Sequence, residues 1–93
     1  MVQIVPNWAH VSGRIEAAEA AADGSLRLRV RVDAADDIPG FANLLGRNVG
    51  DAIEVDVGPG AGAVPAPGQS ISARLRQTGV DTFRAEPSSV SIL

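Results

Sequence analysis

The chain of 93 residues contains no cysteine, no lysine and no tyrosine. Without cysteine it has no disulfide, no thiolate zinc site and no cysteine nucleophile. Without lysine, Schiff-base catalysis is excluded as well. His10 is the single histidine, so one residue alone could act as a base at physiological pH. These absences remove most catalytic chemistry, and we expect a protein that is not an enzyme and uses no cofactor.

Long apolar runs are also missing. The long uncharged stretch that includes Val57 to Ser72 is rich in glycine and proline rather than in large apolar residues, so it predicts no membrane span. The segment from Met1 to Pro6 lacks a basic region and is interrupted by proline, which argues against a signal peptide. We therefore expect a soluble, cytoplasmic protein without a membrane partner.

The overall composition is that of a small folded domain. Hydrophobic residues make up 45% and charged residues 20% of the chain, a balance that excludes disorder along most of it. At this length we expect one domain over residues 1–93. The formal net charge is −3, so the chain lacks the overall positive field that attracts nucleic acid.

Strict alternation of apolar and charged residues is the clearest pattern in the chain. Over residues 26–33 it predicts a half-buried strand, with leucines and valines in the core and arginines facing outward. The same period returns at 53–57 and 71–76, and residues 82–86 and 89–92 predict short closing strands. Val11, Gly13 and Ile15 predict the inner face of a further strand that runs on into an alanine-rich hairpin end.

Strands at this spacing predict an all-β fold: a small antiparallel β-barrel, OB-like, with five to six strands and one short helix. The helix is expected after Asp36-Asp37, with Pro39 in its first turn and Gly46 as its stop. Its apolar residues, which we expect to plug one open end of the barrel, are Phe41, Leu44 and Leu45. This helix position matches an OB-type layout if Gln3-Ile4-Val5 forms a separate first strand. Residues 58–68, rich in glycine and proline, are expected to form a flexible loop between two strands.

Three short motifs have chemical interpretations that we consider weaker than structural ones. His10 and Ser12 share one strand face, but nothing near them suggests an oxyanion hole. The acidic run at 33–37 fits helix capping better than calcium binding, and one histidine with scattered carboxylates predicts no metal site. Residues 58–62 resemble a phosphate loop only superficially, because no Gly-Lys-Ser/Thr follows them.

Two rows of arginines are the sharpest candidates for a binding surface. They are Arg27, Arg29 and Arg31 in one strand and Arg74 and Arg76 in another. If those strands are neighbours, five guanidinium groups form one patch that could follow a phosphate backbone. Against this, Glu54 and Asp56 could pair with arginines across strands. We therefore favour solvated or ion-paired arginines.

The aromatic residues are few. Trp8 either covers a barrel end or anchors an interface, since tryptophan is frequent among binding hot spots. We expect Phe41 and Phe83 to be buried, which leaves few rings for stacking on bases. The sequence thus favours a non-catalytic interaction module that binds a protein partner or associates with itself by pairing edge strands. Single-stranded nucleic-acid binding through the arginine rows is the alternative.

Overall fold

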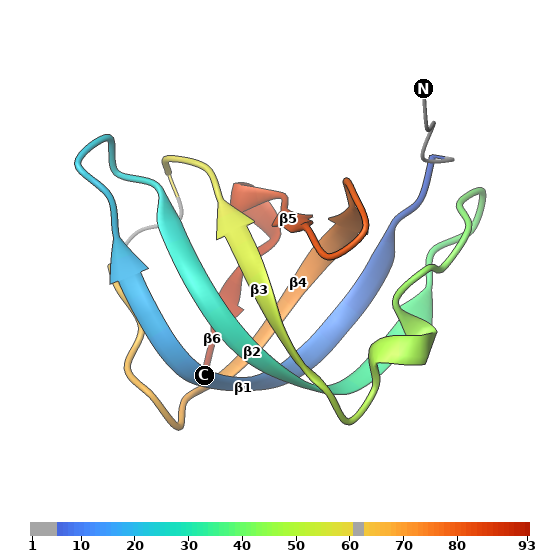
Figure 1. The fold of residues 1–93 in the computed structure, drawn as a ribbon, viewed down its shortest axis with the longest axis horizontal. Coiled ribbons are helices and arrows are strands. Elements are labelled where there is room, and N and C mark those ends of the chain that lie inside the picture. The colour runs from blue at the N-terminus through green and yellow to red at the C-terminus, as the bar shows by residue number, and fades with distance from the viewer. Residues whose placement is uncertain (1–5, 61–62) are drawn as a thin grey trace.

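The computed structural model describes residues 6–60 and 63–93, and Figure 1 shows their path. Six strands and two single-turn 3-10 helices follow one another along this part of the chain. In order, these elements are β1 (Ala9–Ala20), β2 (Leu26–Asp37), η1 (Gly46–Asn48), β3 (Ala52–Val57), β4 (Ser70–Gln77), β5 (Phe83–Ala85), η2 (Pro87–Ser89) and β6 (Ser91–Ile92). Neither short helix has the length or the apolar character of a membrane-spanning segment.

Five of the strands close into a barrel. β1 pairs with β2 and β2 with β3, both antiparallel, and β3 pairs with β5 in parallel. β5 then pairs with β4, and β4 returns to β1, so that the sheet closes on itself. β6 is an extra strand on β4. The all-β barrel expected from the sequence is confirmed.

The barrel interior is filled by the inward-facing residues of the alternating strands. The buried apolar residues are Ala9, Val11, Ile15, Leu26, Leu28, Val30, Val32, Leu45, Ile53, Val55, Val57, Ile71, Ala73, Leu75, Phe83 and Ala85. They include every core residue predicted for the strand at 26–33, and the arginines between them are exposed. Because burial of each large aliphatic side chain stabilises the fold by roughly 1.5–3 kcal/mol, this core is the main source of stability.

β1 pairs with β2 along one edge and with β4 along the other, and in Figure 1 it curves across the base of the view. Its register against β2 shifts twice, between Ser12 and Gly13 and between Ile15 and Ala17. A Cβ atom on Gly13 would clash with the backbone carbonyl of Arg31, so only glycine allows this close approach. The strand reaches Ala20, which confirms the predicted run into an alanine-rich hairpin end.

The helix predicted after residues 36–37 is absent, and this prediction was wrong. Gly40 has a φ of +89°, which a right-handed helix does not allow. The Oδ1 atom of Asn43 accepts hydrogen bonds from the N–H groups of Leu45 and Gly46, so a local turn replaces helical bonds. Leu45 is fully buried as expected, but Phe41 is 41% exposed, contrary to its predicted burial.

The glycine- and proline-rich connection between β3 and β4 is partly held against the body of the protein. Pro65 is buried, and the N–H of Gly68 donates to the carbonyl of Ile15 over 2.8 Å. The loop therefore returns to β1 before β4 begins. The separate first strand considered at Gln3-Ile4-Val5 lies outside the described residues.

Candidate interaction surface

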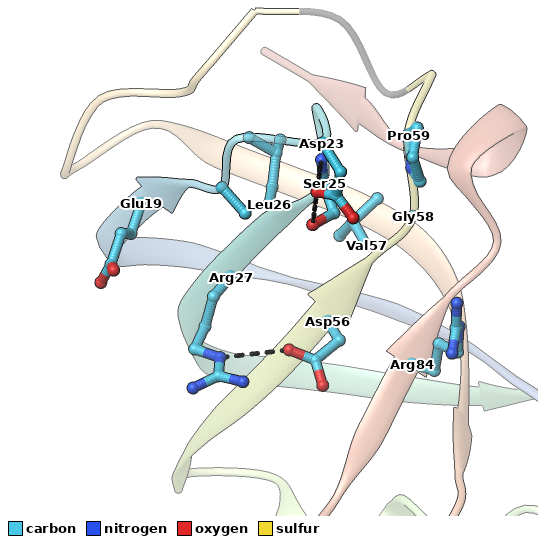
Figure 2. A pocket seen from close by; sticks show the side chains of 11 residues that line it. Glu19, Asp23, Ser25, Leu26, Arg27, Asp56, Val57, Gly58, Pro59 and Arg84 are labelled. Atoms are coloured by element: carbon cyan, nitrogen blue, oxygen red, sulfur yellow. Dashed lines mark hydrogen bonds and ion pairs between the residues drawn. The ribbon is translucent and has the colours of Figure 1, made fainter.

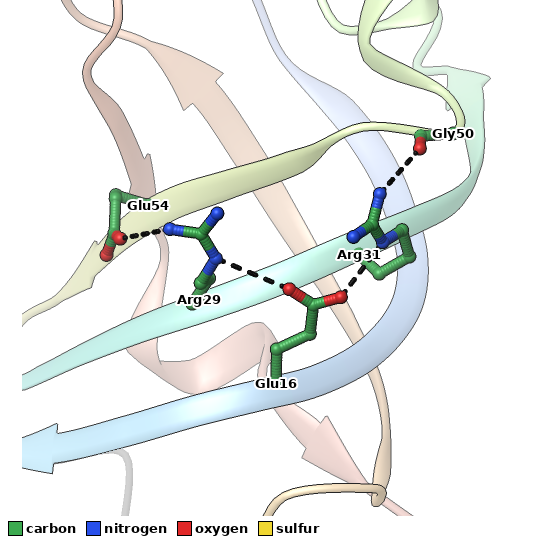
Figure 3. A network of polar contacts seen from close by, with 5 residues as sticks. All are labelled: Glu16, Arg29, Arg31, Gly50 and Glu54. Carbon is green, nitrogen blue, oxygen red and sulfur yellow. Dashed lines mark hydrogen bonds and ion pairs between the residues drawn. The ribbon is translucent and has the colours of Figure 1, made fainter.

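The arginine row of β2 is covered by carboxylates from both neighbouring strands. Glu16 of β1 lies between two arginines and accepts from Arg29 Nε at 3.3 Å and from Arg31 Nε at 2.9 Å (Figure 3). Glu54 of β3 accepts from Arg29 Nη1 at 3.3 Å on the other side. The hydrogen bond from Arg31 is the main cause that lowers the pKa of the Glu16 carboxyl below its ordinary value of 4.5.

The third arginine of the row is paired as well. Arg27 Nε lies 3.2 Å from Asp56 Oδ1, and the β2–β3 register places the two residues directly opposite one another. All these ion pairs are solvent-exposed, so each contributes only about 0–1 kcal/mol to stability. Their consequence is electrostatic, because the outer face of β2 carries little uncompensated positive charge.

The two arginine rows do not form one patch. β1 lies between β2 and β4 on one side of the barrel, and β3 and β5 lie between them on the other. Arg74 and Arg76 therefore belong to a different face from the β2 arginines.

Trp8 lies on that second face. The Cζ atoms of Arg74 and Arg76 are each 5.6 Å from the centroid of its indole ring, a distance at which a cation and an aromatic ring attract one another. The ring is half-buried, and the Trp8 N–H donates to the carbonyl of Ala42 over 3.1 Å. Trp8 thus sits against the outside of the barrel with two guanidinium groups on it.

A buried polar contact fixes this position. Asn7 donates from Nδ2 to the Gln77 carbonyl at 3.0 Å, and its Oδ1 accepts from the Gln77 N–H at 2.7 Å. The side chain of Gln77 accepts in turn from Arg47 Nη2 at 3.0 Å. Because Asn7 and Gln77 adjoin Trp8 and Arg76 in the chain, these bonds hold the ring beside the guanidinium group.

Further basic residues extend this face. The β1–β4 register places His10 opposite Arg74, and the β4–β5 register places Arg84 opposite Arg76. Arg14 lies farther along β1 on the same outward side, opposite Ser70 of β4 and opposite Arg31 of β2, so it marks the end of this face nearest the β2 row. We call this surface the Trp8 strip; it comprises Trp8, His10, Arg14, Arg74, Arg76 and Arg84.

The Trp8 strip has a marked excess of positive charge. It holds four of the eight arginines of a chain whose net charge is −3. Within residues 6–60 and 63–93, the one carboxylate within 4.0 Å of these arginines is that of Glu86, whose Oε2 lies 3.6 Å from Arg74 Nη1. Sequence reasoning identified Trp8, Arg74 and Arg76 but missed Arg84, which the strand order places opposite Arg76, and Arg14, which lies farther along β1.

The interior of the barrel leaves no room for a ligand. The cavity inside the barrel has about 10 Å³ and is lined by apolar side chains, so it cannot hold a substrate. An open depression of about 360 Å³ lies between the β1–β2 turn and the end of β3, and its charged lining includes Asp23, Arg27, Asp56 and Arg84 (Figure 2). No group of three potential metal ligands occurs within residues 6–60 and 63–93.

Comparisons with known proteins found no matching family model, no similar curated protein and no similar solved structure.

Proposed function

We propose that this protein is a non-catalytic interaction module, an OB-type barrel that binds an acidic segment of a protein partner through the Trp8 strip. The closed barrel in the order β1-β2-β3-β5-β4, with β3 parallel to β5, supports the OB-type assignment. OB-type barrels serve as supports for binding surfaces, and their ligands usually lie on the face of strands 2 and 3.

That usual face is poorly suited to an anionic ligand in this protein. Its arginines Arg27, Arg29 and Arg31 are paired with carboxylates of β1 and β3. An approaching anion would have to displace those pairs and would meet the carboxylates themselves. The binding surface is therefore better sought on the other side of the barrel.

The observation that carries the proposal is the environment of Arg76. Its guanidinium group lies on Trp8, and no carboxylate of residues 6–60 or 63–93 is within 4.0 Å of it. Tryptophan and arginine are the residue types most enriched among hot spots of protein interfaces. A half-buried ring flanked by two guanidinium groups, of which that of Arg76 has no carboxylate within 4.0 Å in the described residues, fits a partner that supplies carboxylates around an apolar contact.

Single-stranded nucleic acid fits this surface less well. Binding of single strands relies on several exposed aromatic rings on which bases stack. The strip has one ring, Trp8, and both Arg74 and Arg76 already lie on it. The negative net charge of the chain also weakens long-range attraction to phosphates.

Trp8 itself supplies the test, since it is the one tryptophan in a chain without tyrosine. Its fluorescence is followed while the protein is titrated with a glutamate-rich peptide, a glutamine-rich peptide of equal length, and oligo-dT, at about 50 mM salt and up to about 100 μM ligand. We expect saturable binding of the acidic peptide alone. Arg76→Gln should weaken that binding at least about tenfold, because a charge-assisted contact is lost.

Arg29→Gln is the matched control, because it removes the same charge from the compensated β2 row. It should leave peptide binding within about twofold, as expected for a surface charge outside the contact. Tighter binding of oligo-dT than of the acidic peptide would replace the proposed function by nucleic-acid binding. A response to neither ligand would mean that the Trp8 strip is not a binding surface.

A further inference from the structure

We infer that Arg76 and Arg84 form a two-point anion site that receives a carboxylate of the acidic partner. This inference rests on the proposed function and names the group that the Trp8 strip recognises. The two arginines are direct partners in the antiparallel β4–β5 register. Both side chains project from the outer surface of the barrel, between inward-facing neighbours.

Two like charges in directly opposite positions on neighbouring strands are unfavourable. The arginines of β2 show how this fold compensates such charge, since each has a carboxylate opposite it or beside it. Arg76 and Arg84 have none within 4.0 Å in the described parts of the chain. Arg76 and Arg84 are therefore a pair of like charges without a carboxylate, in contrast to the paired arginines of β2.

The nearest candidate carboxylate is directed elsewhere. Asp56 is the β3 residue opposite Arg84 in the parallel register, but its carboxylate pairs with Arg27 on the far side (Figure 2). Arg84 instead runs beside Gly58, where a Cβ atom would lie 3.8 Å from Arg84 Nη2. The guanidinium group of Arg84 thus lies within contact distance of position 58, and Asp56, which pairs with Arg27, supplies it with no counter-charge.

The two guanidinium groups are turned apart in this structure. Arg76 lies on the Trp8 ring, and Arg84 lies over Gly58. Both are exposed side chains at directly opposite positions of adjacent strands, so rotation about their side-chain bonds can turn both toward one anion. A carboxylate between them accepts from the planar fork of each, and this geometry favours arginine over lysine at such positions.

The test uses inorganic sulfate as the probe and the arginine Nε–H signals in nitrogen-15 NMR as the readout, at constant ionic strength set with chloride. We expect saturable shifts at Arg76 and Arg84 and none at Arg27, whose Nε already donates to Asp56. Arg84→Gln should weaken the response of Arg76 at least about tenfold, because one of the two donors is gone. Arg27→Gln is the matched control and should leave that response unchanged.

Equal shifts at Arg27, Arg76 and Arg84, or no saturation at any of them, would overturn the two-point site. Failure of the site and failure of the proposed function are separable by the peptide titration. Sulfate binding at Arg76 and Arg84 without binding of the glutamate-rich peptide would support the anion site and refute the partner. Peptide binding unaffected by Arg84→Gln would refute the anion site and leave the proposed function standing.

Discussion

The side-chain amide of Asn7 makes two hydrogen bonds to the backbone of Gln77, one to its carbonyl and one from its N–H, although the residues are 70 positions apart. Both residues are buried, with exposed fractions of 3% and 4%. The amide of Asn7 therefore completes the β1–β4 seam where the backbone pairing of the two strands stops at Ala9 and Leu75. It also holds Trp8 at its place beside Arg76.

Asn7→Ala should destabilise the fold by about 2–4 kcal/mol, because it leaves a buried N–H and a buried carbonyl without their partner. The urea midpoint, followed by far-UV circular dichroism, measures this loss. Trp8 fluorescence of the folded variant should shift toward that of an exposed ring. An unchanged midpoint would show that Asn7 does not hold the seam.

Gly13→Ala should destabilise the barrel by about 1–3 kcal/mol, the usual range for overpacking. The new methyl group would meet the carbonyl of Arg31, so β1 or β2 must move at the first register shift. Thermal unfolding measures the change. Gly46→Ala is the control, since a Cβ there meets nothing within 4 Å and its φ is not positive; equal destabilisation of both variants would contradict the prediction.

Leu45→Ala should cost about 2–5 kcal/mol, because Leu45 is fully buried and its removal leaves a cavity in the core. Phe41→Ala should cost less than about 1 kcal/mol, because the Phe41 ring is 41% exposed. Urea unfolding of both variants tests whether Leu45, and not Phe41, closes this end of the barrel. The reverse order of stabilities would show that Phe41, as the sequence suggested, is the residue that packs against this end of the barrel.

Acid should weaken the fold in part through Glu16. Because the folded pKa of Glu16 is depressed below 4.5 by Arg31 and Arg29, its contribution is present above pH 4.5 and is lost as pH falls through the folded value. Glu16→Gln should therefore lose less stability than the parent protein between pH 7 and about pH 3. The urea midpoints at both pH values provide the measurement, and an equal loss in the two proteins would exclude a role for Glu16.

Some acid sensitivity should remain in that variant. Hydrogen bonds from the Ser25 side chain and backbone lower the pKa of Asp23 below 3.8, so the contribution of Asp23 is present above pH 3.8 and is lost as pH falls through its folded value. Asp23→Asn is thus the companion variant, and it should also lose less stability on acidification than the parent protein, as measured by the urea midpoints at pH 7 and about pH 3.

The strands could be predicted from the sequence because period-two alternation depends only on which face of each strand meets the core. In β2, for example, Leu28 and Val30 face the core and Arg29 faces solvent, as their alternation predicts. The absence of the predicted helix could not be foreseen, because Phe41, Leu44 and Leu45 have helical spacing in a segment that is a loop. The positive φ of Gly40 and the hydrogen bond from the Leu45 N–H to the Asn43 side chain determine the backbone conformation of this loop instead.

The candidate surface was predictable only in part, for a different reason. Alternation places Arg76 and Arg84 on the outside of their strands, but it says nothing about which strands are neighbours. The same limit hid Glu16, whose position between Arg29 and Arg31 follows from the β1–β2 register and its second shift. Whether an arginine has a carboxylate beside it depends on which strands are neighbours, so it cannot be predicted from the sequence of one strand.

The seam between β1 and β4 also sets a condition on how the protein is made. Residues 9–14 of β1 find their β4 partners only among residues 70–75. While a ribosome is still adding the segments between, β1, β2 and β3 can pair as an open sheet, but its apolar face stays uncovered. The nascent chain therefore exposes an apolar sheet face until β4 has emerged from the ribosome. During that period, aggregation or capture by a chaperone competes with closure of the barrel.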